Sequence, residues 1–266
     1  MPRRVQAGEQ IPVGEPRGHG LRRHVVVAVL LSALGALGLA EALGLGLAYL
    51  GAAGAVLLAG AALLVGLRDA FGQGHPYSAF GAANRVTLAR AACVGLLAGL
   101  AFEPQTDLRA WSAVAIATLV AVLDGIDGRL ARRSGLVSRF GARFDMETDA
   151  LLILVLAALA WRWERAGAWV LLAGLMRYGF LLAGARFPWL AAELQPSRRR
   201  QTVCVVQSVG LILALVPWLS DAQSATLAAL SLAALCYSFA VDVRVLARRR
   251  YREGVPGKAF QARIDP

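Results

Sequence analysis

Eight long apolar stretches constrain this sequence more than any other feature. A transmembrane helix needs about 20 mostly apolar residues, and each stretch is long enough to form one. Of the 266 residues, 58% are hydrophobic and only 17% are charged. We therefore predict an all-α, polytopic membrane protein and not a water-soluble enzyme. The predicted spans are 25–43, 47–67, 86–102, 110–127, 145–162, 167–185, 202–219 and 224–245.

Positive charge is distributed unevenly among the segments that join these stretches. The chain has 28 Lys and Arg against 17 Asp and Glu, a formal net charge of +11. If the N-terminus is cytoplasmic, the outer loops hold only Arg109, Arg162 and Arg165, and Arg177 lies inside a span. Basic residues accumulate in cytoplasmic loops. We therefore predict an integral protein of the bacterial inner membrane with both termini cytoplasmic, and no nucleic-acid partner.

Four aspartates lie at the predicted cytoplasmic ends of the fourth and fifth spans. Asp124 and Asp127 are three residues apart, and Asp145 and Asp149 are four apart, so each pair shares one face of a helix. Carboxylates at membrane depth are costly and mark a site. Two antiparallel helices joined by a short loop would bring all four together. With no His or Cys nearby, they suit hard cations such as Mg²⁺ or Mn²⁺, and two ions are typical of displacement at phosphorus.

Two neighbouring residues suit a phosphate ligand. Gly128 leaves room for a substrate to approach the backbone, and the guanidinium of Arg132 fits a phosphate group. The alternative is that the aspartates form ion pairs that only hold a cytoplasmic loop in place, which leaves the glycines and the spacing unexplained. The arginines available for such pairs are Arg129, Arg132, Arg139 and Arg143.

This pattern resembles the motif of the CDP-alcohol phosphatidyltransferases. Their motif is D-x-x-D-G-x-x-A-R, then eight residues, then G-x-x-x-D-x-x-x-D, and all fixed positions match over 26 residues: Asp124, Asp127, Gly128, Ala131, Arg132, Gly141, Asp145 and Asp149. The segment Asn84-Arg-Val-Thr87-Leu-Ala-Arg90 resembles the family's entry into its first core helix. A polar helix start capped near Asn84 would look the same.

The resemblance implies a six-helix membrane core preceded by an extra hairpin. Residues 1–68 would form a cytoplasmic tail and a transmembrane hairpin, and 69–246 the catalytic membrane domain. Residues 69–85 are predicted to connect the two at the interface, and 247–266 form a basic cytoplasmic tail. Spacings such as Gly51 to Ala55 and Gly95 to Gly99 permit close helix packing, but chance produces them in so Gly- and Ala-rich a chain.

The resemblance also implies transfer of a phosphatidyl group from CDP-diacylglycerol to an alcohol, with release of CMP. Asp124, Asp127 and Asp145 would bind the metal ions, and Asp149 would share one and act as the general base. Glu147 would face away from them on the helix. The resemblance implies that the residues in contact with the CDP-lipid are Asn84, Thr87, Gly128, Arg132 and Ser138.

The acceptor alcohol is less constrained. In relatives that use a phosphorylated acceptor, basic residues in this region form an anion pocket, which here would be Arg177, Arg198, Arg199 and Arg200. Three consecutive arginines are also typical of a positive-inside loop. Glycerol 3-phosphate is our first choice, and inositol phosphate, phosphatidylglycerol and serine stay open.

Two other functional classes compete with this hypothesis, namely a divalent-ion or solute transporter and an inactive structural relative. A transporter typically has repeated halves with broken helices near the membrane midplane, whereas here the acidic residues gather once, at one membrane edge. All four aspartates are present, which disfavours an inactive relative. Membrane lipids surround the protein in any case, and a homodimer is compatible with the family.

Overall fold

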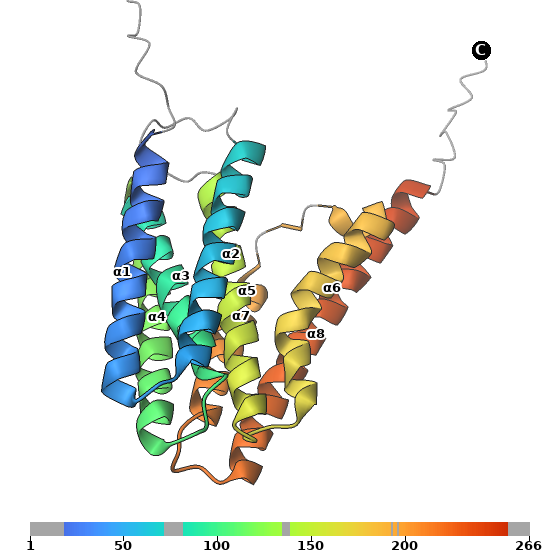
Figure 1. The fold of residues 1–266 in the computed structure, drawn as a ribbon. Coiled ribbons are helices and arrows are strands. Elements are labelled where there is room, and N and C mark those ends of the chain that lie inside the picture. Colours follow the sequence, from blue (N-terminus) through green and yellow to red (C-terminus); the bar gives the residue numbers. More distant parts are fainter. Residues whose placement is uncertain (1–18, 72–81, 135–138, 193, 196, 255–266) are drawn as a thin grey trace, which may run out of the picture.

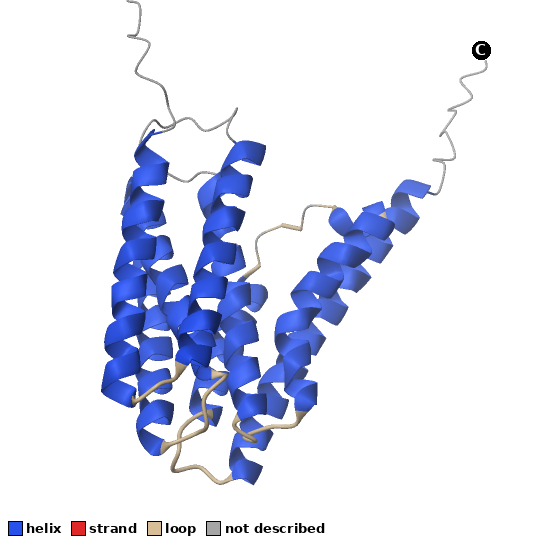
Figure 2. Ribbon diagram, in the orientation of Figure 1, coloured by secondary structure: helices blue, strands red, loops and turns tan. Residues whose placement is uncertain are grey.

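The computed structural model of the chain describes residues 19–71, 82–134, 139–192, 194–195 and 197–254. These residues form eight α-helices and two short 3₁₀ turns, with no strand among them (Figures 1 and 2). The all-α prediction is confirmed. The helices are α1 (His19–Leu43), α2 (Leu47–Phe71), α3 (Ala82–Leu100), α4 (Asp107–Ser134), α5 (Arg139–Arg162), α6 (Leu172–Arg186), α7 (Arg198–Ala214) and α8 (Asp221–Gly254), with turns η2 (Ala168–Leu171) before α6 and η3 (Pro188–Ala191) after it.

Each predicted span overlaps one of these helices, but the ends differ. α4 has 28 residues, about 42 Å at 1.5 Å per residue, and therefore exceeds the roughly 30 Å hydrocarbon core of a bilayer. α8 is longer still, with 34 residues. α7 ends at Ala214 and not at 219, because Pro217 disfavours helical geometry in the residue before it.

Four of the eight helices are long and apolar enough to cross a membrane by themselves within the described residues. These segments are His24–Leu43, Asp107–Ile126, Ala168–Arg186 and Asp221–Tyr251, and α2 adds a shorter apolar helix, Leu47–Ala62. α3 and α5 carry charged side chains near their N-termini, and α7 has only 17 residues, of which the first three are arginines. The number of eight spans therefore stays a prediction.

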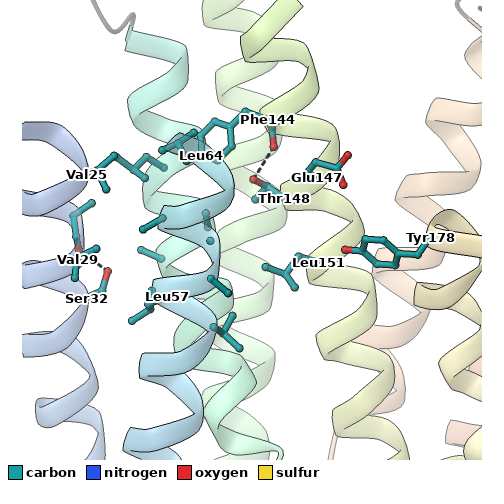
Figure 3. Close-up of a pocket in the computed structure, with 18 residues that line it drawn as sticks. Val25, Val29, Ser32, Leu57, Leu64, Phe144, Glu147, Thr148, Leu151 and Tyr178 are labelled. Atoms are coloured by element: carbon teal, nitrogen blue, oxygen red, sulfur yellow. Dashed lines mark hydrogen bonds between the residues drawn. The ribbon is translucent and has the colours of Figure 1, made fainter. Parts of the chain in front are cut away.

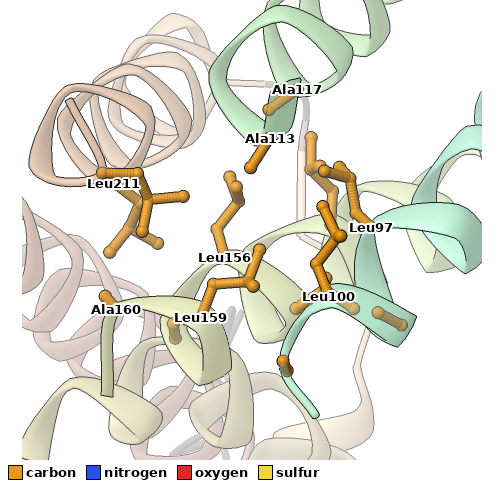
Figure 4. Close-up of a cluster of buried hydrophobic side chains, with 14 of the residues drawn as sticks. Leu97, Leu100, Ala113, Ala117, Leu156, Leu159, Ala160 and Leu211 are labelled. Atoms are coloured by element: carbon orange, nitrogen blue, oxygen red, sulfur yellow. The ribbon is translucent and has the colours of Figure 1, made fainter. Parts of the chain in front are cut away.

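α3 lies at the centre of the bundle, where it packs against α1, α2, α4 and α5. The main buried cluster joins α3, α4, α5 and α7, with Leu97, Leu156 and Leu211 fully buried and Ala113 and Ala117 opposite them (Figure 4). Small side chains on α4 let it approach the leucines of its neighbours closely. α6 and α8 diverge from the rest of the bundle toward the end that carries the C-terminus (Figure 1).

The N-terminal hairpin is attached to this core through two glycines of α3. A Cβ atom added at Gly99 would lie 2.5 Å from the ring of Tyr49, and one at Gly95 would lie 2.6 Å from Leu57. Both positions therefore require glycine for α2 to come this close. Gly95 and Gly99, whose spacing occurs readily by chance, thus pack against α2. A Cβ atom added at Gly51 would meet no atom within 4 Å.

Candidate active site

Three of the four predicted aspartates meet where α4 ends and α5 begins. Asp124 lies on α4, and Asp145 and Asp149 lie on α5 within its first three turns. One carboxylate oxygen from each lies within 4.8 Å of the others. The two helices run antiparallel (Figure 1), so residues about 20 positions apart in the sequence come together.

A buried arginine joins the three carboxylates. Arg90 of α3 donates to Oδ1 of Asp145 at 2.6 Å and to Oδ1 of Asp149, and it lies 2.9 Å from Oδ1 of Asp124. Its side chain is 1% exposed, whereas those of Asp124, Asp145 and Asp149 are 38%, 40% and 27% exposed. The guanidinium therefore lies beneath the cluster and holds the carboxylates from the protein side, while the carboxylates themselves are reachable from outside.

Charge and donor type decide what such a cluster can bind. Three carboxylates around one guanidinium leave two formal negative charges in a small volume, and clustered like charges need a cation to remain ionised together. The ligands are all oxygen atoms, which hard divalent cations prefer. The donor set thus fits Mg²⁺ or Mn²⁺, held by Asp124, Asp145 and Asp149.

Several predicted residues cannot be compared with this geometry. Asp127, Gly128 and Arg132 lie on the last turns of α4, and their side chains are outside the described part of the structure. Ser138 lies between α4 and α5 and is outside the described residues altogether. Their roles stay predictions.

The two upstream residues lie on the helix that carries Arg90. Thr87 is 3% exposed and lies three residues before Arg90, on the same face of α3. Asn84 is partly buried in the first turn. α3 begins at Ala82, so Asn84 lies inside the helix and not at its cap.

Arg177 meets Glu147 and not the aspartates. Glu147 lies on α5 between Asp145 and Asp149 in sequence but faces α6, as expected for its position on the helix (Figure 3). Arg177 donates to its Oε1 at 2.7 Å, and Arg143 lies 2.9 Å from the same oxygen. Arg143 thus pairs with Glu147, and Arg90 pairs with Asp124, Asp145 and Asp149.

The three consecutive arginines open α7. Arg199 donates to Ser238 and to Asp242 of α8, and Arg200 lies 3.6 Å from Asp242, while Arg198 is exposed. α7 packs against α4 and α5, the two helices that carry the clustered aspartates.

The sequence reasoning missed Arg90 as a site residue. A signal was present, since an arginine followed by twelve uncharged residues of a predicted span needs an anionic partner. Which aspartates supply it depends on the rotation of α3 against α4 and α5, and periodicity alone does not determine that rotation.

Comparison with known proteins agrees with the motif. The sequence model of the CDP-alcohol phosphatidyltransferase family matches residues 80–240, which is more than half of the chain. Searches of the curated proteins and of the solved structures give no match. The matched segment begins just before α3 and ends within α8, so it includes Arg90, both aspartate pairs and the α7 arginines, and excludes the hairpin. The chain belongs to the CDP-alcohol phosphatidyltransferase family, phosphotransferases of the membrane that move a phosphatidyl group from a CDP-alcohol to an acceptor.

Proposed function

We propose that this enzyme uses CDP-diacylglycerol as donor and glycerol 3-phosphate as acceptor, and releases CMP. The observation that carries the proposal is the group of three partly exposed carboxylates fixed by the buried Arg90. Arg90 fixes the positions of the three carboxylates, and their anionic oxygen atoms lie on a surface that a substrate can reach. Inositol phosphate, phosphatidylglycerol and serine are the alternative acceptors.

The reaction requires one proton transfer and one displacement. Asp149 accepts the proton of the acceptor hydroxyl, whose oxygen forms a bond to the phosphorus next to the diacylglycerol. The bond between that phosphorus and the bridging oxygen of the CMP phosphate breaks, and CMP leaves with the electron pair of that bond. Arg132 stabilises the charge that develops on the leaving phosphate. Asn84, Thr87, Gly128 and Ser138 contact the CDP-lipid.

Divalent metal ions, Mg²⁺ or Mn²⁺ and two in number, belong to the same proposal. Asp124, Asp127, Asp145 and Asp149 would hold them. When bound, such ions neutralise phosphate charge and orient the two phosphates of the donor. Arg90 holds three of these carboxylates together before any ligand arrives, and it acts as a positioning residue.

An anionic acceptor fits the side of the cluster next to α7. Arg198, Arg199 and Arg200 open that helix, which packs against α4 and α5. Arg177 can contribute only if an acceptor phosphate competes with Glu147 for its guanidinium. Arg199 and Arg200 would likewise have to exchange Asp242 for the acceptor phosphate.

The remaining proposals concern the location of the protein in the cell, its orientation in the membrane and its domains. The bias of basic residues supports the inner membrane of a bacterium, with both termini and the carboxylates on the cytoplasmic side. We divide the chain into a tail with a hairpin (1–68), a catalytic membrane domain (69–246) and a basic tail (247–266). A homodimer is compatible with this arrangement.

The test is CMP release by purified protein in detergent, with CDP-diacylglycerol, Mg²⁺ or Mn²⁺, and each acceptor in turn. We expect release that depends on glycerol 3-phosphate and on metal. Release with another acceptor alone would replace the acceptor but keep the reaction. Failure to bind CDP-diacylglycerol, together with uptake of Mg²⁺ into sealed vesicles, would favour the transporter hypothesis.

A further inference from the structure

A cavity of about 220 Å³ lies between the N-terminal hairpin and the catalytic helices (Figure 3). Side chains of α1, α2, α3 and α5 line it, and Tyr178 of α6 lies at one side. Most are apolar, among them Val29, Leu57, Leu64 and Leu151. Leu57 and Leu64 are seven residues apart on α2, so the cavity extends about 10 Å along that helix.

The hydroxyl groups of two serine and threonine side chains on its wall have partners within the protein. Ser32 donates to the carbonyl of Ala28 at 2.6 Å, and Thr148 donates to the carbonyl of Phe144 at 2.9 Å. A buried water needs two to four polar partners, and an apolar cavity of about 150 Å³ stays dry and takes an apolar guest. This cavity is larger, and in a bilayer the apolar species at this depth is an acyl chain.

A cationic group borders the cavity on the side of α5 and α6. Glu147 lines the cavity, and both Arg143 and Arg177 contact its carboxylate. Two guanidiniums against one carboxylate leave one formal positive charge. The Arg143 and Arg177 side chains are 35% and 21% exposed, so an anionic group can approach them.

The cavity lies away from the aspartate cluster. On α3 it is lined by Leu88, Ala91 and Ala92, whereas Arg90 points to the carboxylates. On α5 it is lined by Thr148 and Leu151, on a different face from Asp149. Adjacent residues on a helix do not face the same side. A donor lipid bound at the carboxylates would have to pass between α3 and α5 to place a chain here.

We propose that this cavity binds one acyl chain of a resident anionic phospholipid of the bilayer, whose phosphate contacts Arg143 and Arg177. This lipid is distinct from the reacting donor. It fills the space between the hairpin and the family core, and the hairpin supplies half of its binding site. The proposal rests on the proposed function in one respect, namely that phosphatidylglycerol is not the acceptor.

Two glycines of α2 provide a matched pair of variants for the test. Gly60 lines the cavity, Gly54 does not, and a Cβ at either position meets no atom within 4 Å. We expect one phosphatidylglycerol per chain to survive detergent exchange in the wild type, counted by mass spectrometry of the intact protein. Gly60→Leu should lower this retention about tenfold, the factor for displacing roughly two methylenes, and Gly54→Leu should not. Equal retention in both variants, or equal loss, would overturn the proposal.

Photocrosslinking of the wild type gives a second readout that needs no variant to fold. Phosphatidylglycerol with a diazirine in its acyl chain should label α2 and α5 around Leu57 and Leu151, and label elsewhere would contradict the assignment. Excess CDP-diacylglycerol should leave this labelling unchanged, since displacement would identify the occupant as the donor. Arg143→Gln should reduce the preference for phosphatidylglycerol over phosphatidylcholine, and an unchanged preference would exclude the phosphate contact.

Discussion

Two buried arginines at opposite ends of the bundle differ in the partners that surround them. Arg165, after α5, is 6% exposed and donates to the carbonyls of Ala214, Val216 and Leu219 and to Asp221. Arg90 at the other end meets three carboxylates. Arg165 thus donates to backbone carbonyls at and just after the end of α7, while the described partners of Arg90 leave an excess of negative charge.

The difference separates a structural arginine from one that belongs to a site. Around Arg165 nearly all partners are neutral, and the exposed Asp221 can be solvated by water. Among the described side chains around Arg90 the anions outnumber the cation, and such a group favours the binding of further positive charge. Burial and hydrogen bonding are similar at the two ends, and the balance of charge distinguishes them.

The largest effect is expected from Asp149→Asn. Loss of the general base should reduce CMP release by about 10²- to 10⁴-fold, while Asp221→Asn, at the other end, should leave the rate unchanged. The measurement is acceptor-dependent CMP release per folded protein, with folding checked by circular dichroism. Comparable rates in the two variants would remove Asp149 from the mechanism.

Arg90→Gln should make stability depend on divalent metal. Removing one partner of a buried ion pair costs about 3–5 kcal/mol, and here it also leaves three carboxylates without their cation. We expect a lower Tm in EDTA that recovers in Mg²⁺, measured by thermal unfolding in detergent. If Mg²⁺ does not change the Tm of the Arg90→Gln variant, the carboxylate cluster does not require a bound metal ion for stability.

Arg165→Gln should destabilise the protein by about 2–3 kcal/mol, because carbonyls at the end of α7 lose a charged donor. The same thermal unfolding should give the same decrease in EDTA and in Mg²⁺. Recovery in Mg²⁺ would contradict the contrast between the two arginines. CMP release by the folded fraction should match the wild type.

The smallest effect is expected from Asp221→Asn. Its side chain is 77% exposed, and exposed ion pairs contribute about 0–1 kcal/mol. The Tm should therefore shift much less than in Arg165→Gln, which would assign the stability at this end to the carbonyls. A shift as large as that of Arg165→Gln would assign it to the ion pair.

The fold class and the approximate helix positions followed from the sequence because apolar stretches of span length must be helical in lipid. The end of α7 was wrong by five residues, since the apolar pattern continues through Pro217 while the backbone does not. The pairs Asp124 and Asp127, and Asp145 and Asp149, likewise indicated a cation site, because neighbours three or four residues apart share a face of a helix whatever the tertiary structure.

The tertiary structure alone decided which residues meet across helices. The rotation of α3 places Arg90 under three carboxylates contributed by two other helices, and the packing of α5 against α6 pairs Arg177 with Glu147. The close approach of α2 to Gly95 and Gly99 positions the hairpin beside the core and encloses a cavity. Local sequence determines helices through their own periodicity, whereas these contacts depend on how whole helices rotate and approach one another, which is set by side chains far apart in the chain.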